Sequence, residues 1–210
     1  MRRPAPARLL ALSAALAAAV ALGGCAASGG STEPASSASD HGGDEHGGST
    51  ATATAGTANE ADIAYAMGMA AHHEQAVEMS EIVLAHDGLD ERVADLAERI
   101  RDAQGPEIAQ MEAWLEAWGA DTSDMAGHGD HGMAGMQSEE DLQAMRDADA
   151  GDAQVLFLEA MVEHHEGALD MAEAHLEEGA DPDALALSEQ VIATQRAEID
   201  EMRALLDELA

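Results

Sequence analysis

The chain has 210 residues, which is long enough for one domain with a hydrophobic core. Aromatic residues make up only 2% of the sequence, whereas Ala, Leu, Met and Glu are abundant, and this composition favours helix over sheet. The formal net charge of −33 argues against binding to nucleic acid or anionic lipid and favours the binding of cations. Because Cys25 is the only cysteine, an internal disulfide and a thiolate metal site are both excluded. Ligands for a soft metal ion would therefore have to be Met and His.

The N-terminal residues are typical of a bacterial lipoprotein signal. A basic start precedes an apolar run over 9–22, and the sequence Leu-Gly-Gly-Cys follows, ending at Cys25. The apolar run is short for a membrane span, whereas Leu-Gly-Gly-Cys resembles a lipobox, which implies cleavage before Cys25 and lipidation of its thiol. The alternative is an ordinary secretory signal with a chance cysteine. We predict a signal peptide over 1–24 and an anchor that holds the mature protein on the extracytoplasmic face of the cell membrane.

Residues 25–58 are predicted to form a disordered tether behind the acylated cysteine. The segment consists largely of Gly, Ser, Thr and Ala, so it has too few apolar side chains to offset the entropy lost on ordering. It contains a tract of His and acidic residues around His41 and His46. This tract either binds metal weakly or serves as a polar spacer.

The remaining residues, 59–210, are predicted to form one helical domain. Capping residues, apolar stripes and glycine stops place four long helices at about 59–88, 90–119, 152–179 and 181–210, with a short helix at about 138–147.

A motif that combines Met with paired His occurs twice. It reads M-x-x-H-H-E-x-A-(V/L)-acid-M, over 69–79 and again over 161–171. At helical spacing the first Met and the first His share the buried face, and the second His lies beside it. A single copy would be explained as a core helix with a hydrogen-bonded His, but the repetition favours a metal site. The candidate ligands are Met69, His72, His73 and Met79 in the first copy and Met161, His164, His165 and Met171 in the second, with His175 further along the same stripe.

The partner helix of each half also carries a repeat. It reads Q-x-x-E-I-x-x-M, at 104–111 and at 195–202. Two repeated helical hairpins, 59–119 and 152–210, predict an all-α, ferritin-like four-helix bundle in which the His motifs meet near the middle. Glu107 and Glu198 fall at the edge of the buried stripes. They either accept a hydrogen bond from His and fix its tautomer, or are solvated edge charges.

Residues 121–137 join the two hairpins and are rich in Met, His and Gly. A pliable backbone of this kind suits a loop that wraps a soft ion, and the alternative is a linker that is rich in Met by chance. The further candidate ligands here are Met125, His128, His131, Met133 and Met136.

The doubled M-x-x-H-H motif, together with Q-x-x-E-I-x-x-M, resembles the domain-of-unknown-function family 305 over about residues 59–210. The resemblance implies a secreted or periplasmic bacterial protein with a ferritin-like bundle and an association with copper binding and copper tolerance. The first copy has Gln75 where the family has Gly, and the second copy keeps Gly167. This departure leaves both alternatives open, that the two halves bind alike or that they differ.

The ligand types favour copper, and Cu(I) in particular, because thioethers are poor ligands for hard ions. A di-iron bundle needs E-x-x-H on two helices, and here Met takes the place of that Glu. We expect a protein without enzymatic activity that sequesters copper, with a metal ion and a membrane as partners and no nucleic acid; a homo-oligomer is compatible with the sequence. The main alternative is a structural or partner-binding bundle in which Met is packing filler, and a ferritin-like oxidoreductase is less favoured.

Overall fold

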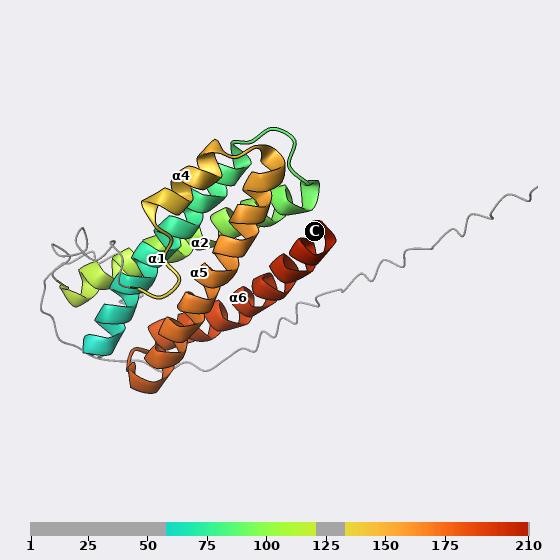
Figure 1. Cartoon of the computed structure of the whole chain (residues 1–210). Helices are drawn as coiled ribbons and strands as arrows, with labels where there is room; N and C mark the ends of the chain where they lie inside the picture. Colours follow the sequence, from blue (N-terminus) through green and yellow to red (C-terminus); the bar gives the residue numbers. More distant parts are fainter. Residues whose placement is uncertain (1–57, 121–132, 210) are drawn as a thin grey trace, which may run out of the picture. The chain divides into compact units, whose positions relative to one another are not determined.

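The computed structural model describes residues 58–120 and 133–209, and all regular structure in these two ranges is helical (Figure 1). The predicted all-α fold is thus confirmed for the described part of the chain. The predicted signal peptide, nearly all of the tether and linker residues 121–132 lie outside it. None of the described helices is long and apolar enough to cross a membrane. The helices are α1 (Glu60–Leu84), α2 (Glu91–Trp118), α4 (Glu139–Asp147), α5 (Ala150–Glu178) and α6 (Pro182–Leu209).

The helix starts follow from local capping chemistry. The side chain of Asn59 accepts hydrogen bonds from the first turn of α1, and the carboxylate of Asp62 accepts one from the Asn59 backbone, which completes a capping box. Asp181 likewise caps α6, which begins at Pro182. Helix α5 begins slightly before its predicted start near Asp152, because Asp149 is its N-cap.

The helices form a bundle of two antiparallel pairs. Helix α1 packs along α2, α5 packs along α6, and the two pairs meet through α1 and α5. Helix α4 packs against both α1 and α5 (Figure 1). On the other side of the bundle, ion pairs join α2 to α6, including Arg99 with Glu201 at 2.6 Å. These contacts enclose the inward faces of all four long helices.

The interior consists of two apolar clusters with a polar layer between them. On α1, Tyr65 to Ala70 contribute to one cluster and Ala76 to Val83 to the other. On α5 the order is reversed, with Phe157 to Met161 in the second cluster and Ala168 to Ala172 in the first. In both helices the paired His lie between these segments. The fold therefore places the two His motifs at the same level inside the bundle.

Candidate functional site

Four buried imidazoles form the polar layer. His72 and His73 come from α1, His164 and His165 come from α5, and each is completely buried. The rings of His72 and His164 are 3.7 Å apart between centroids and are tilted by 37°, while His164 and His165 are 6.2 Å apart. Helices α1 and α5 are neighbours, so the first His of each motif meets its counterpart directly.

The second His of each motif is held by a glutamate from the partner helix. Nε2–H of His73 donates to Glu107 at 2.9 Å, and Nε2–H of His165 donates to Glu198 at 2.8 Å. A carboxylate can only accept, so the proton lies on Nε2 and the lone pair lies on Nδ1. Glu107 and Glu198 thus occupy the orienting positions considered from the sequence, and this type of contact usually fixes a metal-binding imidazole.

Many nitrogen atoms in this layer have no hydrogen-bond partner. Within the described residues, this holds for Nδ1 of His72, His73 and His165 and for both nitrogens of His164. The amide oxygens of Gln104 and Gln195, which occupy equivalent positions in the two halves, are also buried without a partner among these residues. A buried polar atom left unpaired typically costs about 1–3 kcal/mol. Several polar atoms of the layer therefore lack hydrogen-bond partners among the described residues, and the imidazole lone pairs are available to a ligand.

The buried imidazoles of His72, His164 and His165 are neutral at physiological pH. Burial lowers the pKa of His72 to about 3, and the electrostatic interaction with His73 acts in the same direction. Burial also lowers the pKa of His164 well below its ordinary value. The pKa of His165 is lowered by burial even though Glu198 opposes this effect. Neutral imidazole is the form that binds a metal ion.

Methionine side chains lie on both sides of the layer. Met69 belongs to one apolar cluster, and Met79 and Met161 belong to the other; all three are fully buried. Met133 and Met171 are partly buried, and their sulfur atoms lie 3.6 and 3.8 Å from the point where a Cβ on Gly68 would be. Met136 is partly buried in the segment that follows Met133. Met125, His128, His131 and Cys25 lie outside the described residues.

His175 makes contacts that the sequence did not predict. Its Nδ1 lies 2.7 Å from the hydroxyl of Ser188, its Nε2 lies 2.9 Å from Asp62, and its ring stacks on Tyr65 at 4.1 Å. Both ring nitrogens have protein partners, so these contacts give no support to the prediction that His175 is a metal ligand. The sequence reasoning missed Asp62 as its partner, although an acid at the third position of a capping box is already directed toward the bundle end.

Asp62 holds one end of the bundle together. Its buried carboxylate accepts hydrogen bonds from the backbone of Asn59, Ala180 and Asp181 as well as from His175. Burial alone would raise the pKa of this carboxyl, but these hydrogen bonds together hold the pKa below its ordinary value. The network joins α1, α5 and the start of α6, so its role is structural.

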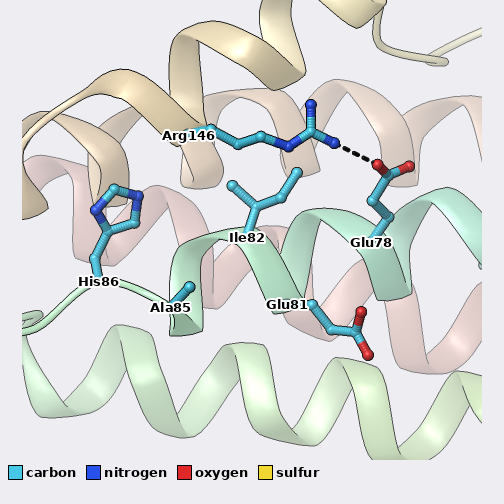
Figure 2. Close-up of a pocket in the computed structure, with 6 residues that line it drawn as sticks. All are labelled: Glu78, Glu81, Ile82, Ala85, His86 and Arg146. Atoms are coloured by element: carbon cyan, nitrogen blue, oxygen red, sulfur yellow. Dashed lines mark hydrogen bonds and ion pairs between the residues drawn. The ribbon is translucent and has the colours of Figure 1, made fainter.

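A surface cleft near the end of α1 is separate from the histidine layer (Figure 2). Arg146 of α4 pairs with Glu78 at 2.5 Å, and Nε2 of His86 contacts the carbonyl oxygen of Met145 at 3.1 Å. These polar groups already have protein partners. The cleft is lined by Glu78, Glu81, Ile82, Ala85, His86 and Arg146.

In the described part of the chain, no three His, Cys, Asp or Glu side chains converge as a metal-binding group. The buried layer has paired imidazoles rather than a triad of such residues. Thioether sulfur beside neutral imidazole is a set of donor types that suits copper more than a hard cation.

The architecture and the layer define an all-helical bundle with a duplicated pair of buried histidines. The chain belongs to the DUF305 family, described as a domain of unknown function, whose profile matches residues 62–206. No curated protein matches the chain.

Solved structures of the same family are similar to this chain. A putative secreted DUF305 protein from Streptomyces coelicolor is 34% identical, with a TM-score of 0.65, and the match covers 71% of this chain and 93% of that one. A DUF305 fragment from Deinococcus radiodurans is 30% identical, with a TM-score of 0.62 and coverages of 72% and 98%.

A third similar protein, CopM, has been solved with copper. Its Cu(I)-bound form is 25% identical to this chain, with a TM-score of 0.57 and coverages of 70% and 96%. Its Cu(II)-bound form is 27% identical, with a TM-score of 0.62 and coverages of 71% and 97%.

Proposed function

We propose that the protein binds and sequesters copper, preferentially as Cu(I), and is held on the extracytoplasmic face of the membrane by a lipid on Cys25. The observation that carries the copper proposal is the layer of four buried imidazoles whose lone pairs lack partners among the described residues. The similarity to CopM, solved in Cu(I)- and Cu(II)-bound forms, supports the choice of metal. The chain acts as a binding protein rather than as an enzyme.

The ligand chemistry supports copper over zinc or iron. Neutral imidazoles serve copper in both oxidation states, and the thioethers of Met69, Met79 and Met161 lie in the clusters next to the layer. Glu107 and Glu198 orient His73 and His165 and increase their basicity. Metal would be held by a subset of these groups after small side-chain rotations.

The charge of the molecule supports the capture of cations. The formal net charge is −33, and each arginine in the described residues forms an ion pair with an acid. The remaining acidic groups create a negative field that raises the local concentration of cations. This effect is strongest at low ionic strength.

The copper proposal is tested by titrating purified protein against a Cu(I) chelator of known affinity. The variant that changes His72, His73, His164 and His165 to Ala should lose most high-affinity binding. His86→Ala is the matched control, because His86 contacts the Met145 carbonyl in the surface cleft and lies outside the layer. Unchanged affinity in the quadruple variant would reject the buried site.

The membrane proposal has an independent test. Protein expressed from its full gene should partition into detergent phase after Triton X-114 extraction, and Cys25→Ser should move it to the aqueous phase. An unchanged partition of the Cys25→Ser variant would rule out the thiol as the site of anchoring.

A bundle that binds no metal is the second candidate. It is favoured by the methionines themselves, since Met69, Met79 and Met161 are fully buried in apolar clusters where packing alone explains them. A ligand that binds only the folded state must raise its stability. Identical thermal unfolding with and without Cu(I) would support this candidate.

A further inference from the structure

A short segment of the linker crosses the bundle directly over the histidine layer. We call residues 133–137 the strap. Nε2–H of His72 donates to the carbonyl oxygen of Ala134 at 3.3 Å. A Cβ on Gly135 would lie 2.5 Å from the carbonyl oxygen of Glu163 and 2.9 Å from the Cα of His164. The strap therefore contacts α1 through His72 and α5 through the backbone at His164.

The strap fits because two glycines leave room for it. Gly135 has a φ of 82°, which side-chain-bearing residues rarely adopt. A Cβ on Gly167 of α5 would lie only 1.9 Å from the carbonyl oxygen of Ala134. Gly167 is buried beneath the strap, so the Ala134 backbone packs directly against α5 at this point.

Gln75 holds the end of the strap on the α1 side. Its side-chain NH2 donates to the carbonyl oxygen of Gln137 at 2.9 Å, and its side-chain oxygen accepts from the backbone N–H of Gln137 at 2.7 Å. The side chain of Gln137 in turn donates to the carbonyl oxygen of Gly135 at 3.0 Å. Gln75 thus pairs with both the N–H and the carbonyl oxygen of Gln137, which lies outside the helices.

Gln75 and Gly167 occupy the same position in the two copies of the His motif. The difference between the copies follows from the strap, which crosses both of them. On α5 the equivalent position must be empty to admit the Ala134 carbonyl, and on α1 it must carry an amide to bind Gln137. The two residues are therefore complementary parts of one contact.

We propose that Gln75 is a latch that keeps the strap closed over His72 and His164, and that release of this latch gives external ligands access to the buried imidazoles. Gln75 is a positioning residue in this arrangement, because it acts through Gln137 and Ala134 and does not itself bind the ligand. The contacts above support control of access to the imidazoles by Gln75. Control of copper uptake by the same residue rests on the proposed function.

Access can be measured without metal, by the rate at which diethyl pyrocarbonate modifies each histidine of the full-length protein. Gln75→Ala removes both hydrogen bonds to Gln137, and the loss of two neutral hydrogen bonds corresponds to a rise of about tenfold to thirtyfold in the open population. Modification of His72 should accelerate by a similar factor. Gln75→Glu keeps the acceptor for the Gln137 N–H but loses the donor, so it should give an intermediate rate.

His175 is the internal control for this experiment, because it is buried at one end of the bundle by Asp62, Ser188 and Tyr65 and has no contact with the strap. Its modification rate should not change. Gln110→Ala, on the exposed side of α2, is the matched glutamine variant and should behave as the wild type. An unchanged rate at His72, or an equal acceleration at His72 and His175, would overturn the latch.

The rate of Cu(I) transfer from a chelator gives the second readout. With Gln75→Ala, uptake and release should both accelerate by about the same factor as the labelling, while the equilibrium affinity changes much less. Equal transfer rates in Gln75→Ala and wild type would overturn the role of the latch in metal access. If wild-type protein takes up no Cu(I), the proposed function fails, and the labelling rates still decide whether Gln75 controls the strap.

Discussion

The carbonyl oxygen of Ala134 occupies the space that a side chain on Gly167 would need, since a Cβ there would lie 1.9 Å from it. Glycine in a helix normally costs about 1 kcal/mol relative to alanine. Gly167 therefore lowers the helix propensity of α5 but allows close contact with Ala134 of the strap, about thirty residues earlier in the chain.

Gly167→Ala should destabilise the protein despite the better helix propensity of Ala. The new Cβ must displace the Ala134 backbone, and steric overlap of this kind typically costs about 1–3 kcal/mol. Urea denaturation measures the change. Gly68→Ala is the matched control in α1, because the nearest atoms to its Cβ are methionine sulfurs at 3.6 and 3.8 Å, and it should stabilise by up to about 1 kcal/mol. Equal effects of the two substitutions would contradict the contact.

Glu198→Gln should weaken copper binding without unfolding the protein. The amide can no longer act as a charged acceptor for His165, so the imidazole loses basicity and a fixed tautomer. Removal of such a partner typically lowers metal affinity by about tenfold to a hundredfold. The chelator titration measures this, with Glu201→Gln as a control on the same helix, since Glu201 pairs with Arg99 at the surface. Equal affinities for the two variants would show that Glu198 does not support a ligand.

Stability of the metal-free protein should fall as the pH drops below about 6.5. The pKa values of His72, His164 and His165 are lowered in the fold, so between the folded and the ordinary pKa the unfolded chain binds more protons. Protonation therefore favours unfolding, by up to about 1.4 kcal/mol per pH unit for each such histidine. Urea denaturation at several pH values from 8 to 4.5 measures the slope.

The control for the pH experiment is a variant with His72 and His164 both changed to Gln, which should show a shallower decline over the same range. A slope as steep as that of the wild type would mean that other groups govern the acid sensitivity.

Asp62→Asn should be among the most destabilising single changes in the bundle. The amide keeps one acceptor but brings an NH2 group toward the N–H donors of Ala180 and Asp181, and it removes the charge that pairs with His175. Disruption of a buried, hydrogen-bonded charge costs about 3–5 kcal/mol.

Chemical denaturation of Asp62→Asn should be compared with Asp141→Asn, which alters an exposed capping box of α4 and should cost about 1 kcal/mol or less. Because the pKa of Asp62 is lowered, its contribution is present above the ordinary carboxyl value near 3.8 and is lost as the pH falls below it. A loss equal to that of Asp141→Asn would show that the Asp62 network carries little energy.

The helices were predictable from the sequence because their signals are local. Asn59 with Asp62, and Ser138 with Asp141, form the capping boxes that the residue spacing predicts. The meeting of His72 with His164 also follows from the sequence, since two copies of one motif on paired helices are related by the approximate symmetry of the hairpins. Repetition supplied information that a single motif would not carry.

The remaining contacts depend on residues that are far apart in the chain. His175 has the spacing of a ligand, but Asp62, which lies 113 residues away, occupies its Nε2. The linker 121–137 is predicted to be pliable throughout, yet its last residues are fixed by Gln75, 62 positions earlier. The composition of a segment indicates only its local preferences. The partners of His175 and Gln137 depend instead on how distant parts of the chain pack together.

The single strap limits how far the two hairpins can be alike. Equivalent positions in a repeated unit can carry the same residue only where their surroundings are the same. The strap makes different contacts with the two copies, so their surroundings differ. Because Ala134 of the strap lies on one copy and Gln137 on the other, positions 167 and 75 meet opposite requirements, a vacancy and an amide. The exchange Gln75→Gly with Gly167→Gln would restore neither contact, so the chain's twofold likeness ends at this pair of residues.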